Sequence, residues 1–159
     1  MKKNNFASIE GIINVAKRGG IVILVDDEKR ENEGDLIIST SNSNAKNINF
    51  MAKYGRGLIC LAMDSTQAKR LNLSLMSSNN QSRNKTAFTI SIEAKKGITT
   101  GISAKDRAKT ISIASKKNVK KSDIVSPGHV FPIIAKDGGV LVRAGHTEAS
   151  VDISKLAKK

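Results

Sequence analysis

Acidic residues crowd into one short segment of a basic chain. Six of the 14 acidic residues lie between Asp26 and Asp35, although the chain of 159 residues has a formal net charge of +13. Crowded carboxylates repel one another unless a cation, an arginine or bound protons compensate them. A divalent ion is the simplest compensator, because hard oxygen ligands suit Mg²⁺ and Mn²⁺. The segment is a candidate metal or substrate site, and a solvated charged turn is the alternative.

The spacing within this acidic segment favours the functional interpretation. Glu31, Glu33 and Asp35 alternate along the chain, so an extended backbone would direct their side chains to one side. Arg30 could bind a phosphate or compensate the carboxylates. The apolar run 21–25 precedes the segment and the apolar run 36–38 follows it. We therefore expect the charges to lie between two strands.

The chain has only two histidines, His129 and His146, and each follows a glycine in a stretch that we expect to be a restrained loop. Histidine is a frequent metal ligand and transfers protons near neutral pH. A structural role is the alternative for either residue alone. Their joint occurrence in two restrained loops makes functional and structural roles about equally credible.

The segment that contains His146 also has the residue types of a phosphate site. It joins a predicted strand to a predicted helix, and a helix N-terminus offers free N–H groups and a partial positive charge. Gly145 would let the backbone approach an anion, while Arg143 and Thr147 would add polar groups. The alternative is that Thr147 is only a helix cap and Gly145 only a turn residue.

The elements that must position these residues follow from hydrophobic periodicity and capping signals. Ser8 and Ser103 have the features of helix N-caps, and the second has capping-box spacing to Asp106. Helices are predicted after Ser8, over 45–52, over 65–71, from 103 to about 117, and after 147; strands are predicted over 21–25, 58–63, 88–93 and 140–143. In the 88–93 strand, Phe88, Ile90 and Ile92 are expected to face the core and Thr89, Ser91 and Glu93 to face away. The polar stretch 74–85 is typical of a mobile loop. Because strands and helices do not alternate regularly, we expect an α+β fold, a single compact domain with a mixed sheet flanked by helices.

Composition limits the class of protein. The single Cys60 excludes an intrachain disulfide, and the sequence has no apolar stretch of membrane-spanning length and no secretory leader. We therefore expect a cytoplasmic protein without a membrane partner. The lysines are scattered, and there is one Tyr and no Trp, so a specific nucleic-acid partner is not expected despite the charge.

Four motifs, in order along nearly the whole chain, resemble those of the 3,4-dihydroxy-2-butanone 4-phosphate synthase family. They occupy residues 26–35, 97–107, 127–132 and 143–149. The resemblance implies an α+β homodimer with active sites near the subunit interface. It implies a lyase that converts D-ribulose 5-phosphate to formate and L-3,4-dihydroxy-2-butanone 4-phosphate in riboflavin biosynthesis, with Mg²⁺ or Mn²⁺.

The same resemblance implies roles for individual residues. Glu31 and His146 would be the metal ligands, and the catalytic groups would be His129, Glu31 and Glu33. Substrate contacts would come from Arg30, Glu31, Asp35, Thr100, Arg143, Ala144, Gly145, His146 and Thr147, with Thr99 as a further neighbour. We hypothesise that the 74–85 loop closes over the substrate to exclude water.

The chain departs from the family pattern at its end and in this loop. Family members normally continue with a further strand and helix that contain another essential glutamate, whereas this sequence ends at Lys159, and Lys85 stands where a glycine is usual. We expect one domain over 1–159 that lacks this strand and helix. The alternatives to an active lyase are a noncatalytic or weakly active remnant and, less favoured, a basic nucleic-acid-binding protein.

Overall fold

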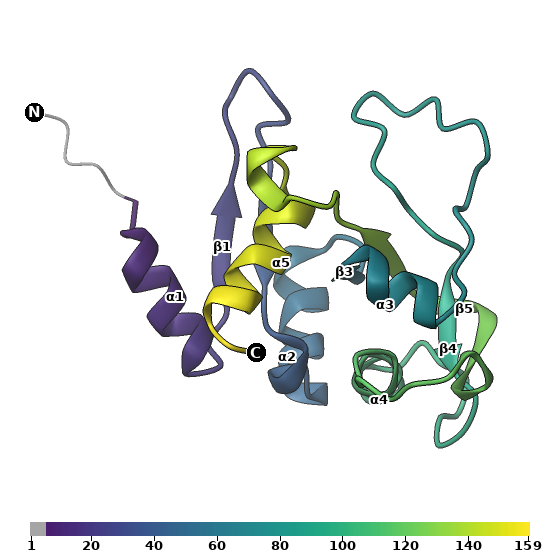
Figure 1. The fold of residues 1–159 in the computed structure, drawn as a ribbon. Helices are drawn as coiled ribbons and strands as arrows, with labels where there is room; N and C mark the ends of the chain where they lie inside the picture. Colours follow the sequence, from purple (N-terminus) through teal and green to yellow (C-terminus); the bar gives the residue numbers. More distant parts are fainter. Residues whose placement is uncertain (1–5) are drawn as a thin grey trace, which may run out of the picture.

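The computed structural model describes residues 6–159 and has an α+β architecture (Figure 1). The helices are α1 (Ile9–Lys17), α2 (Ala45–Phe50), α3 (Ser65–Arg70), α4 (Ala104–Ala114) and α5 (His146–Leu156); α2 continues into the π-helical turn η2 (Met51–Gly55). The strands are β1 (Val22–Val25), β2 (Gly34–Ile37), β3 (Cys60–Met63), β4 (Ile92–Ala94) and β5 (Ile124–Ile134). Short 3-10 turns are η1 (Thr40–Asn42), η3 (Lys121–Asp123) and η4 (Gly139–Leu141).

The strands form a mixed sheet and a separate hairpin. In the three-stranded sheet β5 is central, β3 is parallel to it and β4 is antiparallel. Strands β1 and β2 pair only with each other, antiparallel, from Val22 opposite Ile37 to Val25 opposite Gly34. The expected mixed sheet is confirmed. The strand predicted over 21–25 is confirmed as β1. Its apolar run suggested burial, but a two-stranded hairpin leaves one face open and Ile23 is 65% exposed.

The hydrophobic core lies between the three-stranded sheet and helices α2, α3 and α4. Fully buried side chains from these elements and their ends include Ile48, Leu71, Ile92 and Val130. Burial of each such side chain contributes about 1.5–3 kcal/mol relative to leaving it exposed. The core therefore holds β4 and β5 firmly, whereas the β1–β2 hairpin contributes little to it.

Capping side chains set the helix starts that the sequence predicted. Ser8 Oγ accepts the Gly11 N–H at 3.1 Å, and Ser103 Oγ accepts the Asp106 N–H at 3.0 Å. Helix α4 ends earlier than predicted, at Ala114. The Gln67 side chain explains this, since its Nε2 donates to the Ala114 carbonyl at 2.7 Å and satisfies the helix end.

Three sequence expectations about local structure are wrong. The predicted strand 140–143 is mostly the 3-10 turn η4, in which the Val142 N–H donates to the Gly139 carbonyl. In the predicted 88–93 strand, Thr89 is fully buried, because its N–H and hydroxyl both bond to the Pro132 carbonyl of β5. His129 lies within the long strand β5 and not in a loop.

The polar loop predicted over 74–85 is largely irregular. Residues 76–85 contain no helix or strand, and Leu75 forms an isolated bridge to Thr89. None of the helices in residues 6–159 combines the length and the apolar character that crossing a bilayer demands.

Candidate active site

Asp26 organises the turn between β1 and β2. Its two carboxylate oxygens accept the backbone N–H groups of Glu31 and Glu33, each at 3.0 Å, and Oδ2 also accepts Arg30 Nη1 at 2.8 Å. The N–H of Glu33, followed by the Arg30 guanidinium, holds the pKa of Asp26 below its ordinary value. Asp26 is therefore ionised at neutral pH and holds the backbone of the turn. Asp26 was not among the predicted site residues.

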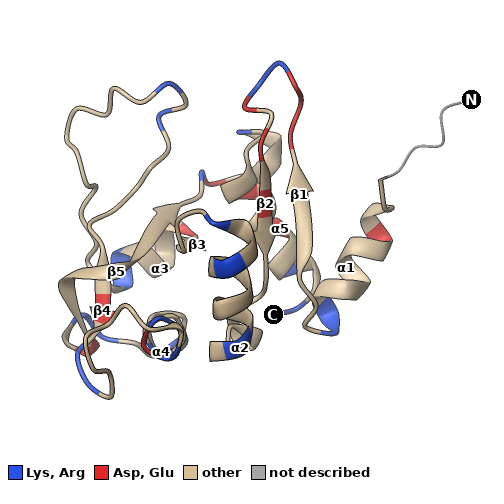
Figure 2. Cartoon of the chain, turned by 180° about the vertical axis from the view of Figure 1, so that it is seen from behind, with Lys and Arg blue, Asp and Glu red and all other residues tan. Residues whose placement is uncertain are grey.

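Arg30 compensates part of the acidic cluster. Its Nη1 lies 2.8 Å from Asp26 Oδ2 and 2.6 Å from Glu31 Oε2. These bonds, the one to Asp26 foremost, raise the pKa of Arg30, so it stays charged. Figure 2 shows the basic tip of this turn with acidic residues on both sides of it. A cation, an arginine or bound protons were the possible compensators of the acidic cluster. Arg30 neutralises charge on one side of it.

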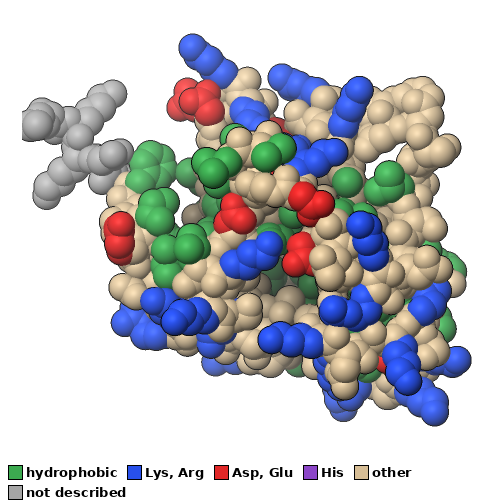
Figure 3. Space-filling model, in the orientation of Figure 1, with side chains coloured by type: hydrophobic (Ala, Val, Ile, Leu, Met, Phe, Trp, Pro, Cys, Tyr) green, Lys and Arg blue, Asp and Glu red, His purple; other side chains and the backbone are tan. Residues whose placement is uncertain are grey.

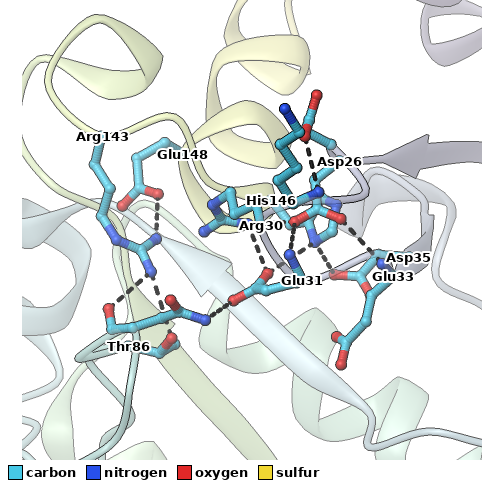
Figure 4. Close-up of polar contacts among 12 residues, drawn as sticks. Asp26, Arg30, Glu31, Glu33, Asp35, Thr86, Arg143, His146 and Glu148 are labelled. Carbon is cyan, nitrogen blue, oxygen red and sulfur yellow. Dashed lines mark hydrogen bonds and ion pairs between the residues drawn. The ribbon is translucent and has the colours of Figure 1, made fainter.

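His146 meets the other side of the cluster. It is the first residue of α5, and its Nδ1 lies 3.3 Å from Asp35 Oδ2 and 3.8 Å from Glu31 Oε2 (Figure 4). The other ring nitrogen, Nε2, is buried and has no hydrogen-bond partner among residues 6–159. The structure therefore brings together three predicted site residues from the hairpin and from α5.

The Glu31 and His146 donors fit a divalent metal ion. Two ligands about 2.1 Å from one octahedral ion lie about 3.0 Å apart when adjacent and about 4.2 Å apart when opposite. The 3.8 Å between Glu31 Oε2 and His146 Nδ1 lies between these two separations, so a small side-chain shift would bring both atoms onto one ion. No group of three or more acidic, His or Cys side chains in the described part of the chain could hold an ion. Water or substrate oxygens would have to complete the coordination, which is usual for Mg²⁺.

Arg143 is held by a buried carboxylate. Its Nη1 donates to Glu148 Oε2 at 2.6 Å, and Glu148 Oε1 accepts the Lys136 N–H at 2.9 Å. Glu148 is only 1% exposed. A Cβ atom on Gly145 would overlap the Arg143 guanidinium and the Glu148 carboxylate, so a larger residue here would displace this pair. The pair fixes Arg143 beside the first turn of α5.

The polar loop reaches both halves of this cluster (Figure 4). Arg143 Nη2 donates to the Asn84 carbonyl at 3.2 Å and to Thr86 Oγ1 at 3.4 Å, and the Asn84 side chain donates to Glu31 Oε1. The sequence analysis missed Asn84, Thr86 and Glu148. Glu148 lies within the 143–149 motif and could have been singled out there, whereas no local signal marks Asn84.

A cavity of about 470 Å³ opens among these residues. This volume is within the usual range for a small-molecule site. Its polar lining includes Arg30, Glu31, Asp35, Arg143, His146 and Thr147. The helix cap before α5 is Gly145, so the alternative of Thr147 as the N-cap is wrong. Thr147 is buried, and with Ala144 and Gly145 it belongs to the segment that enters α5.

Cys60 also lines the cavity, at the start of β3. Burial, with a smaller contribution from the charge of Asp35, raises the pKa of the Cys60 thiol to about 12. The thiol is therefore protonated at neutral pH and is a poor nucleophile.

The structure does not bring every predicted residue to this cavity. His129 Nδ1 contacts the Glu93 carboxylate on the neighbouring strand β4, and Thr100 is exposed in the 97–101 loop; neither lines the cavity. Glu33 does line it, but its backbone N–H bonds to Asp26 and its side chain is outside the ion pairs described above. The sequence analysis expected Glu93 to be an outward-facing strand residue and did not identify its contact with His129.

Comparisons with known proteins give one family. The family model for 3,4-dihydroxy-2-butanone 4-phosphate synthase matches residues 10–159. A protein of that name from Pseudomonas aeruginosa is 51% identical over 150 residues, which are 94% of this chain and 41% of that protein. The riboflavin biosynthesis protein RibBA from Synechocystis sp. is 53% identical over 154 residues, 96% of this chain and 28% of that protein. The chain thus spans less than half the length of these curated relatives.

Solved structures agree in fold. A 3,4-dihydroxy-2-butanone 4-phosphate synthase in complex with two magnesium ions has a TM-score of 0.94 at 39% identity, with 97% of this chain and 72% of that chain covered. A two-domain 3,4-dihydroxy-2-butanone 4-phosphate synthase from A. baumannii has a TM-score of 0.91 at 46% identity, with 96% and 45% covered. Since the family model matches nearly all of the sequence and the solved relatives share its fold, the chain belongs to the 3,4-dihydroxy-2-butanone 4-phosphate synthase family.

Proposed function

We propose that this chain is a lyase that converts D-ribulose 5-phosphate to L-3,4-dihydroxy-2-butanone 4-phosphate and formate in riboflavin biosynthesis. The observation that carries this proposal is the convergence of Glu31, Asp35 and His146 on one cavity. Membership of the family supports the assignment of the reaction.

The phosphate of the substrate binds beside the start of α5. The N–H groups of the first helical turn have no partner within the helix, and the helix dipole favours an anion there. Arg143 adds a charged donor that Glu148 already orients. Ala144, Gly145 and Thr147 complete the substrate contacts on this side.

Glu31 and His146 hold Mg²⁺ or Mn²⁺ in this proposal. The solved relative with two magnesium ions supports the choice of Mg²⁺, and a carboxylate with an imidazole also suits Mn²⁺. A bound divalent ion supplies Lewis-acid polarisation of the sugar oxygens. The substrate and the two products balance in atoms, so no external oxidant or reductant is required.

The protein side chains orient the sugar and move its protons. Arg30 and Asp35 contact the substrate, with Arg30 held in place by Asp26. Glu31 and Glu33 on the hairpin, together with His129, accept and return protons as the carbon chain rearranges. The 74–85 loop, tied to Arg143 through Asn84, excludes water from the cavity.

A second copy of the chain supplies His129 and Thr100 to this cavity. Within one chain neither residue lines it, and the His129 side chain is 44% exposed and open to a partner. We therefore propose a homodimer with a shared active site. A cytoplasmic location and a single domain over 1–159 complete the proposal; the buried cluster around β5 in residues 6–159 supports the single domain.

The activity is tested by formate release from ribulose 5-phosphate in the presence of Mg²⁺, measured with formate dehydrogenase. Purified protein should release formate, chelation with EDTA should abolish the release, and Glu31→Ala should lower kcat by at least about 10²-fold, as for a positioned acid–base group. Glu28→Ala is the matched control, since Glu28 is exposed in the same turn and does not line the cavity.

Folded protein that releases no formate would overturn the proposed activity. Calorimetry with ribulose 5-phosphate would then distinguish a noncatalytic phosphosugar-binding protein, which still gives a heat of binding, from a protein without this site.

A further inference from the structure

Glu93 contacts His129 across two neighbouring strands. The His129 Nδ1 faces Glu93 Oε1, and the side chain of Glu93 is 15% exposed against 44% for His129. Within residues 6–159 the hydrogen bonds of this imidazole involve only Nδ1. One ring nitrogen is therefore tied to a carboxylate while the other is free to meet a substrate.

The backbone around His129 is shaped for this contact. The register between β4 and β5 shifts between Ile92 and Glu93, and such irregularities redirect a side chain. A Cβ atom on Gly128 would overlap the backbone of Ile92, while the Gly128 N–H donates to Ser91 Oγ at 3.0 Å. The glycine before His129 therefore lets β5 approach β4 closely enough for the imidazole to reach Glu93.

The 97–101 loop covers the other side of Glu93. Gly101 has a φ of +91°, and a Cβ atom there would overlap the Glu93 carboxylate. Buried Asp106 holds this loop, since its Oδ2 accepts the Thr99 N–H at 3.2 Å, the Thr99 hydroxyl at 2.7 Å and the Gly101 N–H at 3.1 Å. The loop that contains Thr100 thus limits the positions open to the Glu93 carboxylate.

We propose that Glu93 is a positioning residue that fixes the tautomer and orientation of His129. By accepting a hydrogen bond from the Nδ1–H group, Glu93 holds the ring in the tautomer whose Nε2 is unprotonated and able to accept a proton from the substrate. A carboxylate in this position also stabilises the imidazolium that forms after the transfer. This proposal deepens, and rests on, the proposed function of His129 in the lyase reaction.

The direct test is nuclear magnetic resonance of the imidazole nitrogens in protein labelled with ¹⁵N-histidine. The chain has only two histidines, and His129→Asn identifies the His129 signals. In the unaltered protein, neutral His129 should have a protonated Nδ1 and an unprotonated Nε2. Finding Nε2 protonated instead would overturn the proposal, whatever any variant does.

Variants of Glu93 connect the tautomer to catalysis. Glu93→Ala should shift His129 toward the Nε2-protonated form that free histidine favours and lower kcat by about 10- to 100-fold, part of the factor an acid–base group supplies. KM should change little, because Glu93 does not touch the substrate. Glu93→Gln keeps an oxygen that can accept a hydrogen bond from the Nδ1–H, so it should retain the tautomer and more of kcat than the Ala variant.

Equal kcat values for the Gln and Ala variants would overturn the positioning role. So would a Glu93→Ala protein in which the His129 tautomer and kcat are both unchanged. If the unaltered protein releases no formate, the proposed function fails, while the nitrogen spectra still decide whether Glu93 fixes His129. Circular dichroism verifies that each variant is folded.

Discussion

At the scale of single residues, Glu148 shows how a buried charge serves the site. A carboxylate taken out of water costs several kcal/mol unless it is paired and hydrogen-bonded. Both oxygens of Glu148 are used, one by Arg143 and one by the Lys136 N–H. The pairing leaves the remaining guanidinium donors of Arg143 directed toward Asn84 and Thr86. Glu148 thus orients Arg143 without contacting the cavity itself.

Removing this carboxylate should destabilise the protein. Glu148→Ala leaves Arg143 and the Lys136 N–H without their acceptor, and we expect the free energy of unfolding to fall by about 3–5 kcal/mol, as for a broken buried ion pair. Urea denaturation followed by circular dichroism measures this loss. Glu148→Gln, which keeps an acceptor for Lys136, should lose less. A loss below about 1 kcal/mol for the Ala variant would mean that the pair behaves as a surface ion pair.

At the scale of elements, the start of α4 fixes the adjacent loop. The sequence predicted a capping box from Ser103 and Asp106, and the Ser103 half is confirmed. The Asp106 carboxylate instead accepts three hydrogen bonds from Thr99 and Gly101. These bonds, the Thr99 hydroxyl first, lower the pKa of Asp106. The ionised Asp106 therefore stabilises the folded protein at pH values above the pKa that it has in the unfolded chain. This stabilisation is lost as the pH falls through the lower pKa that Asp106 has in the folded protein.

The direction of this pKa shift predicts how the stability of the Asp106→Asn variant depends on pH. The variant should be less stable than the unaltered protein at pH 7, and the difference should narrow below about pH 4, where the unfolded carboxyl begins to bind a proton. Denaturant unfolding at a series of pH values from 7 to 3 measures the difference. Asp123→Asn is the control, since exposed Asp123 accepts a single backbone N–H from Lys120. A constant difference across the series would contradict the assignment.

Local signals predicted the elements but not the contacts between distant ones. Ser8 and Ser103 mark helix starts because capping is a bond within a few residues. The apolar run after Gly139 predicted a strand, but β propensity depends on a partner strand, and Leu141 instead lies 95% exposed in a turn. The hairpin charges and His146 were singled out by residue type and spacing, and the family motifs then implied their roles. Asn84 and Glu93 contact residues that are distant in the sequence, so no pattern in the residues next to them predicts these contacts.

At the scale of the whole molecule, the predicted site residues fall on two parts of the fold. Figure 1 shows β4 far from the β1–β2 hairpin, with the core elements between them. Basic side chains are dispersed over the face seen in Figure 3 and do not form a single stripe. A shared site in a dimer would join the two parts without rearranging either chain.

Complementation between two inactive variants tests this shared site. Glu31→Ala and His129→Ala should each be inactive alone, but coexpressed chains with different tags should form heterodimers in which one site has neither substitution. With random pairing, about a quarter of the sites in the mixture are intact, because each site takes one half from each chain. Formate release near that fraction supports shared sites. Purified heterodimers without activity would show that each site lies within one chain.

The separation of the β1–β2 hairpin from the three-stranded sheet has a further consequence. An isolated pair of strands is only marginally stable in water, and this pair contacts mainly α1 and neighbouring segments while β5 is anchored in the core. Its backbone amides can therefore exchange with solvent through local opening that leaves β5 closed. The carboxylates of the turn would move when the hairpin opens, while the three-stranded sheet stays closed. An entering ligand would therefore contact a mobile part of the site on the hairpin and a rigid part on the core elements.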